Sequence, residues 1–211
     1  MEAPQVSGFE HLFVPAAHPS SRLVVVLHGL GDSLEGFQFL PDMLGLPELN
    51  YLLLNAPEDY YVGHAWFDLE DPEPGILASR ALLRGLFAEL LQQGWPSRDL
   101  LLFGFSQGCL MCIDFGLRYE QPLAGIVGIS GYAAFLDRLE SEMHPAARRQ
   151  SWLITHGDTD DLLPLTRTRA QVERLKSAGI PIEWHEFSKG HTLDPAAELP
   201  LIRAWIAARW P

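Results

Sequence analysis

The chain alternates between short apolar runs and longer segments in which apolar residues recur at helical intervals. Runs that are apolar on both faces are typical of buried strands in a parallel sheet. They predict strands at 22–27, 51–54, 100–103, 123–129 and 151–155. Residues 182–187 alternate in polarity and predict a half-exposed strand near a sheet edge, and the apolar residues of 9–14 predict a short edge strand.

Segments with helical periodicity lie between these strands. They predict helices over 76–91, 165–178 and 196–210, a helix after Gly108 whose apolar positions run from 110 to 117, a short helix over 132–143, and another over 33–46 that Pro41 interrupts. Strands that alternate with helices imply a largely parallel sheet covered on both faces. The sequence therefore predicts an α/β fold. Its 211 residues, without an internal repeat or linker, predict a single domain over 1–211.

The stretch from Asp99 to Tyr119 is the most informative, because G-x-S-x-G at 104–108 stands between a predicted strand and a predicted helix. A strand that turns directly into a helix forces one residue into a strained backbone conformation, and flanking glycines remove Cβ atoms that would clash. Ser106 would then stand above the sheet at a helix N-terminus, where partial positive charge stabilises an oxyanion. This context favours a nucleophilic serine over an ordinary turn.

Composition narrows the class of protein. Hydrophobic residues make up 47% of the chain and charged residues 20%, which indicates a globular protein. The net charge of −12, with scattered Lys and Arg residues, argues against nucleic acid or an anionic membrane surface as the main partner. Cys109 and Cys112 share one predicted helix, and we interpret both as core residues rather than a redox pair.

The sequence carries few signals for targeting, metals or cofactors. No apolar run reaches the roughly 18 residues of a membrane-spanning helix, and no signal-peptide pattern opens the chain, so we expect a cytoplasmic protein with no integral membrane segment. Dispersed histidines and the lack of H-E-x-x-H predict no metal. The glycine-rich loop at 28–32 lacks a following G-K-[ST] and carries Asp32, so we expect no phosphate there and no cofactor.

A serine needs a base to take its proton, and the base needs a carboxylate to orient it. In an α/β fold of this kind the chain order is Ser, then Asp or Glu, then His, each after a strand. Asp158, Asp160 and Asp161 follow the strand at 151–155, and sequence physics does not separate Asp158 from Asp160. His191 follows the strand at 182–187, whereas His185 lies within it, so His191 is the better base.

Backbone amides should stabilise the oxyanion. The residue after the nucleophile supplies one, Gln107, and the loop after an early strand supplies the second, Leu30, with Gly29 as the alternative. Residues 58–74 form a long connection rich in aromatics, in which Trp66 and Phe67 either line an acyl site or cover the core. His28 and His156 each end a strand, and we expect them to orient their loops.

Five motifs together resemble the phospholipase/carboxylesterase family of α/β-hydrolases: LHGLGD at 27–32, AWFD at 65–68, GFSQG at 104–108, HGDTDDLLP at 156–164 and GH at 190–191. The resemblance implies an α/β-hydrolase fold, Ser106 as nucleophile, His191 as base, and Asp160 rather than Asp158 as the acid. Leu30 and Gln107 match the family's oxyanion positions. Cys109 stands where the family commonly has a second glycine, and Asp161 where proline is common.

The expected function is therefore hydrolysis of carboxylic esters or thioesters of short to medium acyl chains through an acyl-enzyme. Two alternatives stay open: a thioesterase or lysophospholipase for longer acyl chains, acting on a lipidated protein or lysophospholipid, and a non-catalytic scaffold that binds a ligand. We expect Leu30, Trp66 and Phe67 to contact the substrate. The protein is expected to be a monomer or homodimer.

Overall fold

A computed structural model describes residues 2–210. Its main sheet has the strand order β1-β3-β2-β6-β7-β8-β9, and a separate hairpin pairs β4 with β5. The strands are β1 His11–Val14, β2 Leu23–Leu27, β3 Asn50–Leu54, β4 Glu58–Tyr60, β5 Gly63–Ala65, β6 Leu100–Phe105, β7 Gly125–Ile129, β8 Trp152–Gly157 and β9 Ile182–Phe187. Only the pairing of β1 with β3 is antiparallel within the main sheet, which confirms the expected largely parallel α/β architecture.

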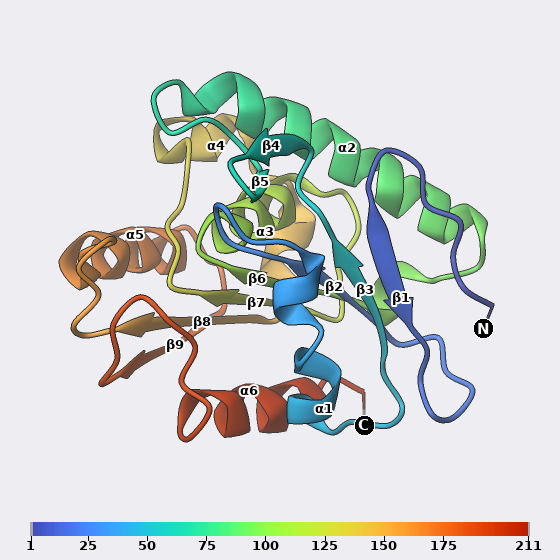
Figure 1. Ribbon diagram of the computed structural model, residues 1–211. Helices are drawn as coiled ribbons and strands as arrows, with labels where there is room; N and C mark the ends of the chain where they lie inside the picture. The colour runs from blue at the N-terminus through green and yellow to red at the C-terminus, as the bar shows by residue number, and fades with distance from the viewer. Residues whose placement is uncertain (1, 211) are drawn as a thin grey trace.

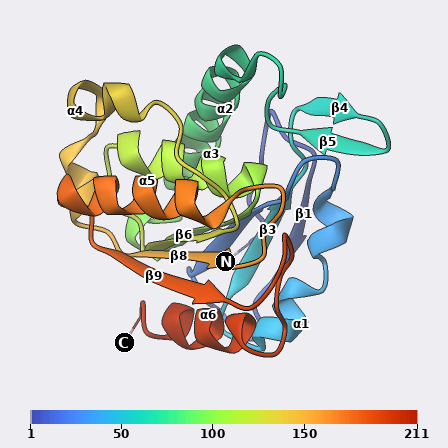
Figure 2. The same cartoon turned by 90° about the vertical axis from the view of Figure 1, so that its left-hand side faces the viewer.

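The helices are α1 Leu40–Leu44, α2 Pro72–Gln92, α3 Gln107–Arg118, α4 Leu139–Glu142, α5 Leu165–Ser177 and α6 Glu198–Ala207. Short 3-10 turns cover Leu34–Phe37, Ser97–Asp99, Leu136–Arg138 and Pro145–Arg148. Helices α2, α3 and α5 lie on one face of the sheet, while α1 and α6 lie on the other (Figures 1 and 2).

Two cores result, one on each face, because successive side chains of a strand point in opposite directions. In β2, Leu23, Val25 and Leu27 join the core under α2, α3 and α5, whereas Val24 and Val26 join the core under α1 and α6. All five β2 side chains are buried, as a strand with two covered faces requires.

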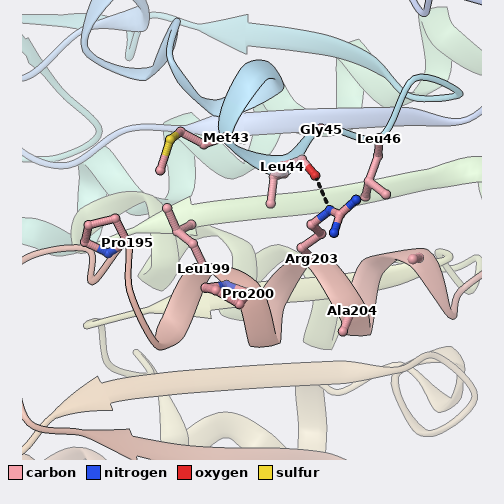
Figure 3. Close-up of a pocket in the computed structure, with 10 residues that line it drawn as sticks. Met43, Leu44, Gly45, Leu46, Pro195, Leu199, Pro200, Arg203 and Ala204 are labelled. Atoms are coloured by element: carbon pink, nitrogen blue, oxygen red, sulfur yellow. Dashed lines mark hydrogen bonds between the residues drawn. The ribbon is translucent and has the colours of Figure 1, made fainter.

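The two helices on the second face are tied together by a polar contact as well as by apolar packing. Arg203 of α6 donates from Nε to the carbonyl oxygen of Leu44, the last residue of α1, at 2.7 Å (Figure 3). The bond satisfies a carbonyl at the helix end that has no partner within the helix. Gly45 follows with φ +55°, a conformation that suits glycine at a helix C-terminus.

Several expected elements differ in detail. Pro41 lies in the first turn of α1, where its missing N–H costs nothing, so it helps begin the helix and does not interrupt it. Within 132–143 only the 3-10 turn and the four residues of α4 are helical. The connection at 58–74 is partly regular, because residues 58–65 form the β4–β5 hairpin.

Candidate active site

Ser106 occupies the junction between β6 and α3 with φ 54° and ψ −113°, a strained conformation for a residue with a side chain. The flanking glycines permit it by close approach of backbones. A Cβ on Gly104 would lie 2.3 Å from the carbonyl oxygen of Gly108, and one on Gly108 would lie 2.1 Å from that of Leu27. The reason expected from the sequence, removal of clashing Cβ atoms, is therefore the one found.

Three side chains that are far apart in the sequence meet at the carboxyl edge of the sheet. The Ser106 hydroxyl lies 2.9 Å from Nε2 of His191, and Nδ1 of His191 lies 2.7 Å from Oδ2 of Asp160. The other oxygen of Asp160 accepts the backbone N–H groups of Leu162 and Leu163 at 3.1 and 2.8 Å. Asp158 and Asp161 are both exposed, and the bond to His191 is made by Asp160 alone of the three.

His185 does not reach this site. It lies on the edge strand β9, where its Nε2 is 2.8 Å from Oε1 of Glu183 on the same strand. The loop position of His191, beyond the end of β9, is what lets its ring stand over Ser106.

The Asp160 carboxylate is poised to stay ionised. Burial would raise its pKa, but the Leu163 N–H and the His191 ring outweigh burial and hold the pKa below its usual range. A carboxylate that keeps its charge fixes the Nδ1–H tautomer of His191, which leaves Nε2 free to accept the Ser106 proton.

The two expected oxyanion donors flank the serine. Within residues 2–210 neither the Leu30 nor the Gln107 amide has a hydrogen-bond acceptor, whereas the amide of Gly31, the residue after Leu30, donates to the His64 carbonyl at 2.8 Å. A Cβ on Gly29 would lie 3.3 Å from Cβ of Ser106, so the loop that carries Leu30 directly contacts the serine. Gln107 begins α3, whose N-terminus adds partial positive charge.

The Gln107 side chain holds the segment that follows the hairpin. Its Oε1 accepts the Trp66 N–H and its Nε2 donates to the Phe67 carbonyl, both at 2.9 Å. Gln107 is buried, and these two backbone groups satisfy both polar atoms of its side chain. The sequence reasoning assigned only the amide of Gln107 and missed this second role of the residue.

Trp66 and Phe67 have different environments. The indole of Trp66 is fully buried and donates to the carbonyl of His28, at the start of the loop that carries Leu30, at 2.9 Å. The Trp66 ring therefore belongs to the core and does not line the cavity beside Ser106, contrary to the expectation that it contacts substrate. Phe67 does line that cavity, together with Leu30.

A cavity of about 480 Å³ opens beside Ser106. It is lined by Gly29, Leu30, Asp32, Phe67, Leu69, Phe105, Ser106, Gln107, Tyr132, Leu162, Leu163, Arg167 and His191. A second hollow of about 570 Å³ shares Asp32, Phe105 and His191 with it and continues past the residues Gly36, Phe37, Phe39, Met43, Thr192, Leu193, Pro195 and Leu199. Two mainly apolar spaces therefore meet at the imidazole, with room for a group on each side of a scissile bond.

A buried ion pair supports the loop that carries His191. Lys189 donates to both carboxylate oxygens of Glu198 at 2.7 and 2.6 Å, and to the carbonyl of Thr192 at 2.7 Å. Glu198 also accepts the N–H of Asp194 at 3.0 Å. Burial lowers the pKa of Lys189, and the Glu198 carboxylate opposes that effect. The sequence reasoning missed this pair, since nothing local marks a lysine and a glutamate nine residues apart.

His28 and His156 are buried and act on their loops, as expected. His28 contacts the Gly29 carbonyl through Nδ1 at 2.6 Å and accepts the Ala56 N–H on Nε2 at 3.1 Å, so its ring is neutral. Nε2 of His156 lies 2.7 Å from the Leu163 carbonyl. Burial lowers the pKa of both rings despite nearby groups that favour the charged form.

Other features of the described chain bear on function. Cys109 and Cys112 are free and fully buried, and burial raises the pKa of Cys109 to about 12, which confirms the interpretation of both as core residues. Residues 2–210 contain no group of three or more His, Cys, Asp or Glu side chains placed to hold a metal ion. Among the same residues, no helix combines the length and apolarity needed to cross a membrane.

The parallel sheet, the strained serine after β6 and the serine–histidine–aspartate series at its carboxyl edge define an α/β-hydrolase. The profile of the phospholipase/carboxylesterase family matches residues 11–208, and the chain belongs to that family. It is thus a hydrolase of the carboxylesterase and acyl thioesterase class, as the motifs implied.

Individual relatives have names that match this class of hydrolase. The chain is 31% identical to acyl-protein thioesterase 1 of Schizosaccharomyces pombe over 72% of this chain and 74% of the relative. It is 27% identical to acyl-protein thioesterase 1 of Gibberella zeae over 95% of each chain. Among solved structures, esterase PE8 is 28% identical and superposes with a TM-score of 0.85, covering 95% of this chain and 98% of the esterase.

The backbone at Ser106 generates a stability prediction. Replacing Ser106 with glycine removes the side chain that makes φ 54° unfavourable, whereas Ser106→Ala keeps that strain. We expect Ser106→Gly to be more stable than Ser106→Ala by about 1 kcal/mol, measured by urea unfolding monitored by circular dichroism. Equal stability of the two variants would show that the backbone at this junction is not under strain.

The two buried histidines generate a pH prediction. An unfolded histidine takes up a proton near pH 6.5, whereas His28 and His156 do so only at lower pH when folded. Between those values the unfolded state binds more protons, so stability falls as pH decreases, by at most about 1.4 kcal/mol per pH unit for each ring. Carboxylates with depressed pKa values change the pH dependence of stability only below roughly pH 4.5, so they do not contribute to the decline that begins near pH 6.5.

Urea midpoints between pH 8 and pH 5 measure this effect. We expect a flat profile above about pH 7 and a decline below about pH 6.5. His156→Gln retains a donor toward the Leu163 carbonyl without a titrating ring, and should show a shallower decline. An unchanged slope in this variant would contradict the assignment.

The buried pair behind His191 generates a third prediction. Lys189→Met leaves the Glu198 carboxylate buried without its cation, so we expect a loss of about 3–5 kcal/mol in unfolding free energy and at least a tenfold lower kcat for ester hydrolysis. The matched double variant Lys189→Met/Glu198→Gln removes both charges and should recover most of the stability. If Lys189→Met is as stable as the double variant, the ion pair does not fix the loop.

Proposed function

We propose that the protein cleaves carboxylic esters or thioesters of short to medium acyl chains through an acyl-enzyme on Ser106. The observation that carries the proposal is the pair of bonds from His191, 2.9 Å to the Ser106 hydroxyl and 2.7 Å to the Asp160 carboxylate. A serine, an imidazole and a carboxylate in this order form a nucleophile, a base and the group that orients the base.

In the first half of the reaction, Ser106 Oγ attacks the acyl carbonyl carbon while Nε2 of His191 takes the hydroxyl proton. The carbonyl oxygen becomes an oxyanion between the Leu30 and Gln107 amides, which have no acceptor within residues 2–210. His191 then returns the proton to the leaving alkoxide or thiolate as the carbon–oxygen or carbon–sulfur bond breaks. Asp160 stays ionised and stabilises the imidazolium.

In the second half, a water molecule attacks the acyl-serine and gives its proton to His191. The tetrahedral oxyanion returns to the same two amides, and its collapse releases the carboxylic acid as His191 reprotonates Ser106 Oγ. No other group is needed for proton balance, because one imidazole serves both halves.

The cavity volume accommodates acyl groups of short to medium length. A volume of about 480 Å³ lies in the lower part of the range for small-ligand pockets. We assign the acyl group to this cavity, against Leu30 and Phe67, and the leaving group to the hollow beside Phe37 and Leu193. A second candidate, a thioesterase for longer acyl chains, is favoured by the names of the Schizosaccharomyces pombe and Gibberella zeae relatives.

A panel of p-nitrophenyl esters of increasing chain length, run beside a palmitoyl-peptide thioester, tests the proposal. We expect kcat/KM to be highest for short to medium chains and to fall for palmitoyl. Ser106→Ala should lose at least about 10⁴-fold in kcat, as removal of a triad nucleophile does. A higher kcat/KM for the palmitoyl thioester would favour the long-chain alternative.

A fluorophosphonate probe separates an enzyme from a ligand-binding scaffold. It should label the native protein and the control Ser177→Ala, whose hydroxyl lies on the exposed end of α5, and it should fail on Ser106→Ala. Labelling that persists in Ser106→Ala would remove Ser106 from the proposed mechanism.

A further inference from the structure

One wall of the cavity beside Ser106 carries a cation. Arg167, in the first turn of α5, lines this cavity together with Ser106 and His191. Its guanidinium carbon lies 4.6 Å from the centre of the Tyr132 ring, and Tyr132 lines the same cavity. Stacking on an aromatic face therefore holds the guanidinium at the wall and keeps its N–H groups available.

The charge of Arg167 has no acidic partner within residues 2–210. No carboxylate oxygen in that range lies within 4.0 Å of its guanidinium, and the guanidinium donates no hydrogen bond there. Arg169, two residues along the same helix, shows the contrast, since it donates two bonds of 2.7 Å to Glu186. A guanidinium has five N–H donors, so Arg167 presents a full set toward a ligand.

The place of Arg167 along α5 is electrostatically unfavourable for the helix, and the stack on Tyr132 offsets part of that cost. The first turn of a helix has partial positive charge, which disfavours a cation there. Helix α5 has no acidic residue in its first turn to offset this effect. Arg167 is exposed, faces the cavity and lacks an acidic partner, so its charge is available to a molecule that binds in the cavity.

The rest of the wall defines the chemistry of that ligand. Phe67, Leu69, Leu162 and Leu163 make the lining largely apolar, and its one acidic residue, Asp32, comes from the loop after β2. The protein carries a net charge of −12, so it repels anions as a whole, and attraction of an anion must be local. A molecule that complements the cavity has an apolar body, a carbonyl at Ser106 and an anionic group at Arg167.

We propose that Arg167 binds a carboxylate at the far end of the acyl chain, so that the preferred substrates are esters or thioesters of short dicarboxylic acids with one free carboxylate. This inference rests on the proposed function and specifies its substrate class. The planar fork of the guanidinium matches a carboxylate with two parallel hydrogen bonds. The chemistry at Ser106 is unchanged, because Arg167 contributes binding and takes no proton.

Two acyl groups of equal length test the proposal: mono-p-nitrophenyl adipate, which carries the free carboxylate, and p-nitrophenyl hexanoate, which does not. We expect the adipate-to-hexanoate ratio of kcat/KM to fall about tenfold or more in Arg167→Gln, as loss of a charge-assisted hydrogen bond does. Arg167→Lys, which keeps the charge without the fork, should fall in between. The matched control Arg169→Gln removes one cation outside the cavity and should keep the native ratio.

A third substrate, the hexanoyl ester of 4-hydroxybenzoate, places the carboxylate on the leaving group. If Arg167→Gln affects this ester and leaves the adipate-to-hexanoate ratio unchanged, the anion binds on the other side of the scissile bond and the proposal is overturned. A native adipate-to-hexanoate ratio in Arg167→Gln overturns it in any case.

Binding without turnover separates this inference from the proposed function. In a Ser106→Ala background, calorimetric titration should show that monomethyl adipate binds more tightly than methyl hexanoate, and that Arg167→Gln abolishes the difference. Absent hydrolysis with intact preference for the adipate ester would refute the proposed reaction alone. Equal binding of the two esters to the Ser106→Ala protein would refute the anion site alone.

Discussion

The active-site edge depends on a contact between two backbones that leaves no room for a side chain. The first turn of α3 lies so close to the end of β2 that a Cβ on Gly108 would fall 2.1 Å from the Leu27 carbonyl oxygen. This approach brings the loop with Leu30 against Ser106, so that the amides proposed to hold the oxyanion come from two segments in direct contact. The strained conformation of Ser106 is the local result of that packing.

Buried polar groups then fix the loops that complete the site. Asp160 accepts two backbone N–H groups of its own loop while it bonds to His191. Lys189 and Glu198 hold the next loop, and Gln107 holds the segment after the hairpin. In each case the bond satisfies a buried group that would otherwise be costly, so positioning and stability come from the same contacts. Loops with such anchors can place an imidazole reproducibly without regular secondary structure.

Much of this arrangement was predictable from the sequence. The apolar runs located the strands of the parallel sheet, because burial on both faces leaves a clear mark in composition. The strand–turn–helix context singled out Ser106, and loop position separated His191 from His185. Local pattern left Asp158 and Asp160 equivalent, and the family resemblance chose between them. In the structure only Asp160 of the two bonds to His191.

What the sequence did not reveal depends on contacts between distant segments. The side-chain role of Gln107 needs the backbone at 66–67, forty residues away. Trp66 is buried by packing against Phe9 and the His28 ring and bonds to the His28 carbonyl, contacts that no periodicity encodes. In the sequence, nothing distinguishes Arg167 from other helical arginines, because its place at the cavity and over the Tyr132 ring depends on the tertiary fold.

The sulfur of Cys109 has a consequence for how this chain can diverge from its relatives. A Cβ on Gly128 would lie 2.7 Å from that sulfur, and a Cβ on Gly131 would lie 2.5 Å from it. The thiol thus occupies space that two glycines on another segment leave open. Each of these three positions therefore limits the size of the other two. Even without the sulfur, a Cβ on Gly131 would lie 2.9 Å from the Ser106 carbonyl oxygen and one on Gly128 would lie 2.8 Å from Cδ1 of Ile154, so both glycines are held small from two sides.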